Sequence, residues 1–120
     1  MTPSGMADSE KEGGRMKIRA TDQFDWVRLF YSVPALRGVR VTYEGKEGTI
    51  TGASYGIEVH IDDTPKNRVD AFHPNDLTYV PTERQLATCV RKRQEYWAMA
   101  YPELHYPKAF TFKRTVEAVA

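Results

Sequence analysis

The sequence predicts an α+β domain in which a small five-stranded β-barrel is flanked by helices and followed by an aromatic C-terminal segment. Two observations support this fold class. Between residues 38 and 80, glycine or proline separates short runs of alternating apolar and polar residues, as turns separate strands. Residues 82–99 instead place apolar side chains at helical spacing. A chain of 120 residues can bury one modest core, so we expect a single domain.

The N-terminal region is expected to contribute little to that core. Residues 1–15 are polar and glycine-rich without periodicity, so we expect a disordered leader and a folded domain over 16–120. Residues 16–20 alternate as a short strand does. Residues 22–33 fit either a helical face or strand alternation. We favour a helix that ends before Pro34, because the residue preceding a proline is driven out of the α region.

The barrel is expected over residues 38–80. Its clearest strand is 57–62, where Ile57, Val59 and Ile61 alternate with polar residues. The five strands are expected at 38–43, 49–53, 57–62, 68–73 and 77–80. Short strands of this kind, joined by tight turns, are typical of an SH3-like barrel.

The turns and the fourth strand carry more specific expectations. Glycine allows positive φ in the turn expected over 44–48. Residues 73–76 are expected to form a 3₁₀ turn before the last strand. In the fourth strand, the alternation places Val69 and Ala71 inward and leaves Phe72 exposed.

The last third of the chain is predicted to form a helix and an aromatic extension. Thr82 and Gln85 have the spacing of a capping box, which marks the start of a helix over 82–99. The residues near its apolar face are Leu86, Cys89, Val90 and Trp97. We expect the extension, 100–120, to pack over the barrel or to add an edge strand. Its aromatic residues are Tyr101, Tyr106, Phe110 and Phe112.

Composition predicts a soluble cytoplasmic protein with no membrane partner. The formal net charge is +1, no apolar run approaches the ~18 residues of a membrane span, and the N-terminal region has no apolar stretch of the signal-peptide type. Cys89 is the single cysteine, so no intramolecular disulfide can form, which fits a reducing compartment.

Three segments of the barrel region contain glycine or proline at characteristic positions. They are YSVPALRGVRVTYEG over 31–45, GTITG over 48–52, and the His73–Pro74 pair. This pattern resembles small tailed-phage and prophage proteins of unknown function, and its strand–turn–strand unit is similar to the KOW and Tudor class of small barrels. The resemblance covers residues 31–80 and implies an SH3-like barrel and a phage or prophage origin. It implies no catalytic or ligand residue.

Charge is distributed unevenly along the chain. Residues 38–80 carry four basic and seven acidic residues, a net charge of −3, whereas residues 81–120 carry seven basic and four acidic residues, a net charge of +3. An acidic barrel does not suit nucleic acid, because that affinity comes mainly from neutralising phosphates. We therefore expect a non-catalytic adaptor that binds a protein in an aromatic groove with an acidic rim. The residues expected there are Tyr55, Phe72, Asp62, Asp63 and Asp76.

The sequence also supports alternatives. In one, residues 101–112 cover the barrel aromatics, which then belong to the core. In another, the protein binds nucleic acid through its basic helix and tail, although we favour residues 91–93 as the solvated face of an amphipathic helix. The contacts of that alternative are Arg91, Lys92, Arg93, Lys108, Lys113 and Arg114. A third is self-association through the oppositely charged parts of the chain.

No catalysis, cofactor or metal is expected. His60, His73 and His105 do not form a legible cluster of zinc ligands, and His73 before a proline suits a turn hydrogen bond. Cys89 lies on an apolar helix face, so we expect a buried thiol rather than a nucleophile. The sequence has no glycine-rich phosphate loop and no nucleophile-elbow motif.

Overall fold

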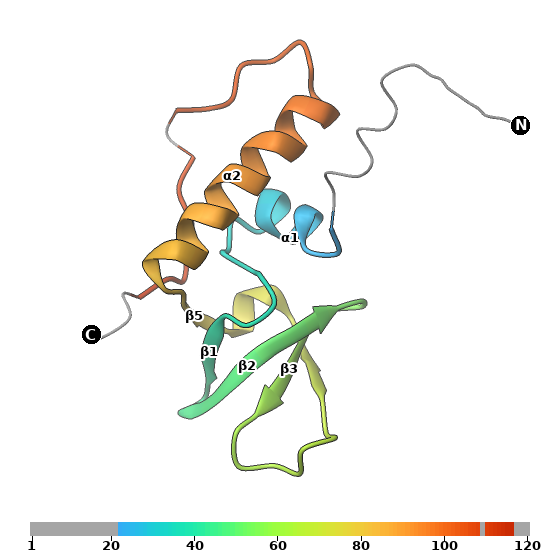
Figure 1. The fold of residues 1–120 in the computed structure, drawn as a ribbon, viewed down its shortest axis with the longest axis vertical. Helices are drawn as coiled ribbons and strands as arrows, with labels where there is room; N and C mark the ends of the chain where they lie inside the picture. The colour runs from blue at the N-terminus through green and yellow to red at the C-terminus, as the bar shows by residue number, and fades with distance from the viewer. Residues whose placement is uncertain (1–21, 109, 117–120) are drawn as a thin grey trace, which may run out of the picture.

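The computed structural model describes residues 22–108 and 110–116. A five-stranded antiparallel sheet forms the lower half of the molecule, and two helices form the upper half (Figure 1). The α+β class predicted from the sequence is therefore confirmed. The leader expected over 1–15 and the strand expected over 16–20 lie outside the described residues.

The sheet consists of five short strands. They are β1 (Arg40–Tyr43), β2 (Lys46–Ala53), β3 (Ile57–Ile61), β4 (Asp70–Phe72) and β5 (Thr78–Val80). Their order is β4-β3-β2-β1-β5, and every neighbouring pair is antiparallel. A 3₁₀ turn, η2 (Pro74–Asp76), connects the edge strands β4 and β5, where the sequence predicts such a turn. Over the described ranges the hydrogen-bonded sheet is open, with β4 and β5 at its two edges.

The turn between β1 and β2 is shorter than predicted. It comprises only residues 44–45, whose φ angles are 49° and 83°, the left-handed conformations that suit the twist of a two-residue hairpin. Tyr43 consequently pairs with Lys46. Gly48 lies within β2 rather than in the turn, and a Cβ atom there would be 2.7 Å from the His60 carbonyl oxygen. Close approach of the β3 backbone therefore explains this glycine.

The prediction that Val69 and Ala71 face inward is wrong, because the alternation in β4 is offset by one residue. Phe72 pairs with the buried Ile57 of β3, so both side chains face the inner side of the sheet. Ala71 pairs with Glu58 and is exposed, as is Val69. Phe72 is consequently half-buried against the core instead of fully exposed.

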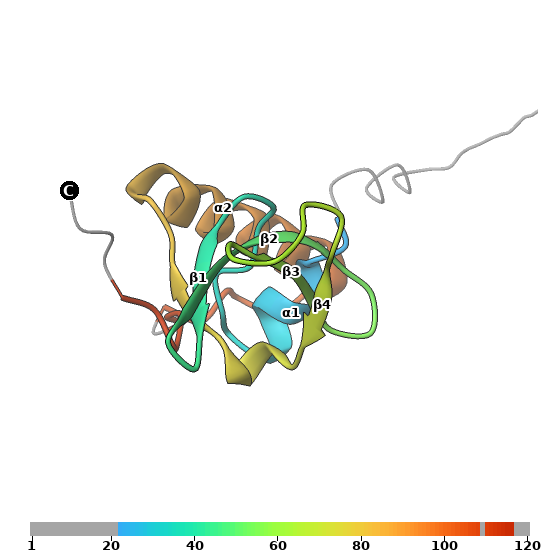
Figure 2. The same ribbon diagram turned by 90° about the horizontal axis from the view of Figure 1, so that it is seen from below.

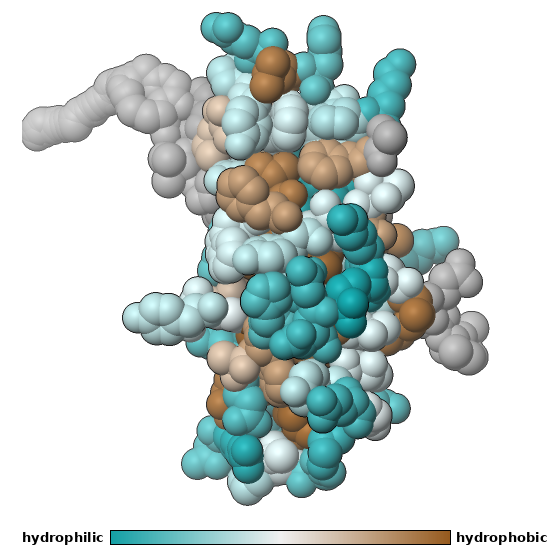
Figure 3. All heavy atoms as spheres, turned by 180° about the vertical axis from the view of Figure 1, so that it is seen from behind, coloured by the Kyte–Doolittle hydropathy of each residue, from teal (hydrophilic) through white to brown (hydrophobic). Residues whose placement is uncertain are grey.

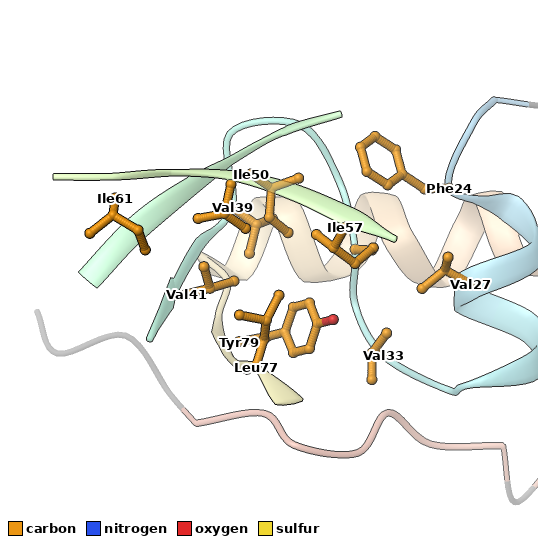
Figure 4. Close-up of a cluster of buried hydrophobic side chains, with 12 residues drawn as sticks. Phe24, Val27, Val33, Val39, Val41, Ile50, Ile57, Ile61, Leu77 and Tyr79 are labelled. Carbon is orange, nitrogen blue, oxygen red and sulfur yellow. The ribbon is translucent and has the colours of Figure 1, made fainter. Parts of the chain in front are cut away.

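The core lies between the inner face of the sheet and α1 (Asp25–Phe30). Its buried residues are Phe24, Val27, Val33, Ala35, Val39, Val41, Ile50, Ile57, Val59, Ile61, Leu77 and Tyr79. Side chains of the strands converge there with Phe24 and Val27 (Figure 4). The Tyr79 hydroxyl donates a hydrogen bond of 2.9 Å to the Pro74 carbonyl, and burial raises the pKa of its phenol. Tyr79 therefore belongs to the core and not to a ligand surface.

The first helix ends earlier than the helix expected over 22–33. Its C-cap is Tyr31, and Ser32 follows with a φ of 54°, a left-handed conformation that interrupts the helix. The chain then passes through the buried Pro34 without regular structure to reach β1.

A buried arginine fixes the position of this helix. Arg28 is fully buried, and its guanidinium donates three hydrogen bonds of 2.8 Å, to Asp22, Asp25 and the Ala35 carbonyl oxygen. Burial raises the pKa of Asp25. Burial opposes ionisation of Asp22 as well, but the Arg28 hydrogen bond and the charges of Arg28 and Lys92 lower its pKa. Because Lys92 lies 3.6 Å from Asp22, the network also includes the second helix.

The second helix, α2 (Glu83–Ala100), begins with the predicted capping box. The Gln85 N–H donates to the Thr82 hydroxyl oxygen at 3.1 Å, and the Thr82 N–H donates to the Gln85 side-chain oxygen at 2.9 Å. Cys89 is fully buried beside the Ala35 carbonyl, 3.7 Å from its thiol sulfur. Burial raises the pKa of the Cys89 thiol, so the expected buried core thiol is confirmed.

The extension after α2 folds back along the helix (Figure 1). Trp97 packs against the rings of Tyr101, Tyr106 and Phe110, with centroid distances of 4.6, 6.0 and 6.0 Å. These aromatic side chains therefore pack on α2. An alternative open from the sequence was that they cover the barrel aromatics instead.

The end of the extension adds a single parallel bridge beside β5, between Tyr79 and Thr115. The Tyr79 N–H donates to the Arg114 carbonyl at 2.8 Å, and the Tyr79 carbonyl accepts from the Val116 N–H at 2.9 Å. Arg114 Nε also donates to the Leu77 carbonyl at 2.7 Å. The expected edge strand is thus reduced to one bridge.

The prediction that Arg93 lies on a solvated helix face is wrong, because its exposed fraction is 2%. Its Nε donates to the Tyr106 hydroxyl at 2.7 Å, and its guanidinium lies 4.2 and 3.8 Å from the ring centroids of Phe110 and Phe112. It also donates to the carbonyls of Phe110 and Thr111 at 3.2 and 3.4 Å. Arg93 therefore holds the extension on α2 and is not available to bind phosphate.

Replacing Arg28 with methionine is expected to destabilise the fold by about 3–5 kcal/mol, because the buried Asp25 then loses its ion-pair partner. The free energy of unfolding, measured by urea denaturation, tests this expectation. Arg91→Met is the matched control, since Arg91 is exposed, pairs with the exposed Glu95, and its loss is expected to cost less than about 1 kcal/mol. Equal losses in the two variants would contradict the role assigned to Arg28.

Arg93→Lys is expected to loosen the extension, because lysine keeps the charge but cannot stack a planar group on two rings while donating to two carbonyls. Hydrogen exchange of the Lys113 and Val116 amides, which donate to the carbonyls of Ser32 and Tyr79, should accelerate by about tenfold or more. Arg84→Lys, at an exposed position of the same helix, serves as the control. Unchanged exchange in both variants would show that the extension is held without Arg93.

Candidate protein-binding groove

A hollow of about 430 Å³ opens between the β1–β2 hairpin and the β3–β4 loop, at the lower end of the molecule in Figure 1. Seen from that end, the sheet curves so that β1 and β4 stand on opposite sides of its inner face (Figure 2). The residues lining the hollow are Tyr43, Lys46, Ile61, Asp63, Thr64, Arg68, Asp70 and Phe72. We refer to this hollow as the groove.

Two aromatic rings form the floor of the groove. Tyr43 is the last residue of β1, and Phe72 is the last residue of β4; their ring centroids are 4.6 Å apart with an interplanar angle of 46°. Ile61, 5% exposed, lines the same hollow. Because β1 and β4 are not neighbours in the sheet, the two rings make a side-chain contact across its inner face. The floor is therefore apolar and accessible from outside.

Two exposed ion pairs stand at the rim. Lys46 Nζ lies 3.8 Å from the Asp63 carboxylate, and Arg68 Nε lies 3.2 Å from the Asp70 carboxylate. Exposed pairs of this kind contribute at most about 1 kcal/mol each. A charged ligand group can consequently replace one of these partners at little cost in free energy.

The phenol of Tyr43 lies in an acidic environment. The negative charge of Glu44, then partial burial, then the charge of Asp76 raise the pKa of this phenol. The phenol is therefore neutral at physiological pH and can donate a hydrogen bond. The four charged residues that line the groove, Lys46, Asp63, Arg68 and Asp70, sum to zero. Glu44 and Asp76, which act on the Tyr43 phenol, add two negative charges beside it. Such a surface favours a cationic partner over an anionic one.

The structure brings together three of the five residues predicted for protein binding. Phe72 and Asp63 line the groove, and Asp76 acts on the phenol at its edge. Asp62 instead pairs with Arg40 on β1, with Arg40 Nη1 2.8 Å from its Oδ1, and does not line the groove. Tyr55 is fully exposed at the β2–β3 turn and also lies apart from it.

Six residues that line the groove were not among the predicted binding residues: Tyr43, Lys46, Ile61, Thr64, Arg68 and Asp70. Tyr43 is the aromatic residue of this set. The alternation of Val39, Val41 and Tyr43 places it on the inner face of β1. Its position directly before a tight hairpin is the feature of the sequence that could have identified it as a groove residue. An inward-facing aromatic residue at the end of a strand reaches the open end of the sheet. Lys46 and Arg68 line the groove only because the β1–β2 hairpin and the β3–β4 loop place them there, so their sequence positions alone did not identify them.

The basic residues of the nucleic-acid alternative do not form one available surface. Arg91 pairs with Glu95 at 3.3 Å, Lys92 lies 3.6 Å from Asp22, and Arg93 is buried. Lys108, Lys113 and Arg114 are exposed on the extension. The helical half of the predicted site is therefore neutralised or buried.

Two of the three histidines, His60 and His73, serve local structure. His73 Nδ1 accepts a hydrogen bond of 3.1 Å from the Asn75 N–H, which confirms the expected turn role. His60 Nδ1 lies 2.9 Å from the Arg68 carbonyl and ties β3 to the loop that borders the groove. Within residues 22–108 and 110–116, no three His, Cys, Asp or Glu side chains are grouped so that they could hold a metal ion. None of the described helices has the length and apolar character needed to cross a membrane.

Comparisons of this chain with protein-family models, with curated proteins and with solved structures find no match.

Proposed function

We propose that this chain is a non-catalytic protein-binding module whose curved sheet is an SH3-like barrel, encoded by a phage or prophage. The strand order β4-β3-β2-β1-β5, with a 3₁₀ turn between β4 and β5, supports this barrel type. The contact between Tyr43 and Phe72 supports it further, because side-chain packing joins the two sides of the curved sheet. The resemblance of residues 31–80 to small phage proteins supports the origin.

The Tyr43–Phe72 pair with its acidic surroundings is the observation that carries the proposed function. A basic side chain can lie on aromatic rings while its charge meets carboxylates at the rim. Apolar neighbours of that side chain can pack on the rings and on Ile61. The proposed ligand is therefore an extended protein segment that combines apolar and basic residues.

Reversing one rim charge tests this proposal with little risk to the fold. Asp63 is exposed, so Asp63→Lys is expected to leave the unfolding midpoint nearly unchanged. Affinity for short peptides that combine leucine and lysine, measured by titration calorimetry, should fall by about tenfold or more. Glu95→Lys, on the exposed face of α2, is the charge-matched control and should retain binding. Peptides that bind both variants equally would exclude the groove as the site.

A gel-shift experiment separates the proposed function from the nucleic-acid alternative. Because Arg91 and Lys92 have acidic partners and Arg93 is buried, we expect no retardation of duplex DNA or single-stranded RNA in a gel, even at low salt. Retardation that disappears in Lys108→Glu, Lys113→Glu protein would overturn the proposed function in favour of nucleic-acid binding. Retardation that persists in that variant would locate the nucleic-acid site elsewhere on the chain, and it too would count against a purely protein-binding role.

A further inference from the structure

Residues 15–19, which precede the described part of the chain, have the composition proposed for a ligand of the groove. Their sequence is Arg-Met-Lys-Ile-Arg, in which the apolar Met16 and Ile18 alternate with three cations. The sequence has no acidic residue over 13–21, whereas residues 1–12 contain three acidic residues and one lysine. In an extended ligand, such alternation places the two apolar side chains on one face. We call residues 15–19 the basic segment.

The described chain begins at a fixed point close to the sheet. Asp22 is bonded to the buried guanidinium at 2.8 Å, and the Gln23 side-chain oxygen accepts a hydrogen bond of 2.9 Å from the Ala53 N–H, at the end of β2. Figures 1 and 2 show this blue start on the same side of the molecule as β4. The basic segment is therefore tethered near the edge strand that carries Phe72.

The groove lies within reach of this tether. Ala53 and Phe72 pair with the same residue of β3, so they are two strand spacings, about 10 Å, apart. The four residue steps from Ile18 to Asp22 span at most about 14 Å, and the six steps from Met16 span at most about 21 Å. Because β4 is an edge strand of the described sheet, the path from Asp22 to the groove passes beside the sheet and not through it.

We propose that the basic segment of this chain occupies the chain's own groove and competes there with the protein partner. Met16 and Ile18 then pack on the Tyr43–Phe72 rings, and the cations of the segment lie at the rim. This inference rests on the proposed function, because it names a regulator of the same groove.

The tether and the apolar alternation favour this occupant. The charges that line the groove cancel in pairs, so charge contributes only through the two carboxylates beside the Tyr43 phenol. In Figure 3, the apolar surface at the lower end of the molecule consists of small brown areas between hydrophilic side chains. A ligand whose apolar residues alternate with cations suits such a surface, because its apolar side chains can enter separately while the cations stay in water.

The tether makes occupation favourable even for a weak ligand. A ligand on the same chain acts at an effective concentration of the order of 1 mM. A segment that binds with a Kd of about 100 µM when separate would then fill about 90% of the grooves. A partner peptide has to displace it, so the apparent affinity of that peptide falls about tenfold. The basic segment thus acts as an autoinhibitory ligand.

Titration calorimetry of the full chain with the leucine–lysine peptides tests this competition. Met16→Asp, Ile18→Asp protein should bind these peptides about tenfold more tightly than unmodified protein, because the groove is then free. Met6→Asp, Ala7→Asp protein adds the same charge outside the basic segment and should bind as unmodified protein does. Both pairs of substitutions precede the described residues, so the unfolding midpoint should stay unchanged.

A synthetic peptide of residues 14–21 supplies a direct test. It should bind Met16→Asp, Ile18→Asp protein, and adding Asp63→Lys to that protein should weaken binding by about tenfold or more. In NMR spectra without peptide, the Met16→Asp, Ile18→Asp change should shift the amide signal of Phe72 at every protein concentration. A shift that appears only at high concentration would assign the segment to the groove of a second copy and overturn occupation of its own.

The two proposals fail in different ways. Equal affinity of unmodified and Met16→Asp, Ile18→Asp protein for leucine–lysine peptides, with binding still weakened by Asp63→Lys, would overturn autoinhibition and leave the proposed function intact. Failure of the peptide of residues 14–21 to bind at millimolar concentration, while leucine–lysine peptides bind, would have the same meaning. Absence of binding by both kinds of peptide in every variant would remove both proposals.

Discussion

The arrangement of this molecule depends on one buried cation, Arg28. Its guanidinium is bonded to carboxylates beside α1 and to the Ala35 carbonyl, in the segment that enters β1. Lys92 brings α2 into the same network. A buried charge is strongly unfavourable unless it is paired and hydrogen-bonded, so the network favours the placement of the helices over the sheet in which these partners meet Arg28. The direction in which β1 leaves the helical layer follows from that placement, and Tyr43 lies at the far end of β1.

A second buried cation, Arg93, is satisfied in a different way. Its partners are a phenol, two carbonyls and the faces of aromatic rings, and all of them belong to the extension after α2. The helix and the extension therefore become ordered together, because neither the cation nor the rings are covered without the other. This mutual requirement explains how a segment with no regular secondary structure can hold Leu104 in a defined position at the end of the molecule.

Features that depend on local chemistry were predictable from the sequence, and features that depend on distant contacts were not. Alternation in β3, the capping box of α2 and the 3₁₀ turn all follow from neighbouring residues. The offset of β4 was not predictable, because a three-residue strand shows too little alternation to place Phe72. The burial of Arg93 depends on aromatic residues in a non-periodic segment. Of the candidate site, Asp63 and Phe72 were identified, whereas the contact between Tyr43 and Phe72 depends on the curvature of the sheet.

The two-residue turn after β1 has a consequence for how related sequences can vary. One side of the groove is the hairpin that carries Tyr43 and Lys46, and its turn, residues 44–45, has two left-handed residues, a two-residue geometry that an insertion would not preserve. The opposite wall is the β3–β4 loop, over residues 62–69, which is largely exposed and joins strands whose pairing is complete without it. Length changes in that loop cost little in loop-closure entropy. Ligand preference can therefore diverge along a lineage through this loop alone, while the aromatic floor and the rest of the fold stay unaltered.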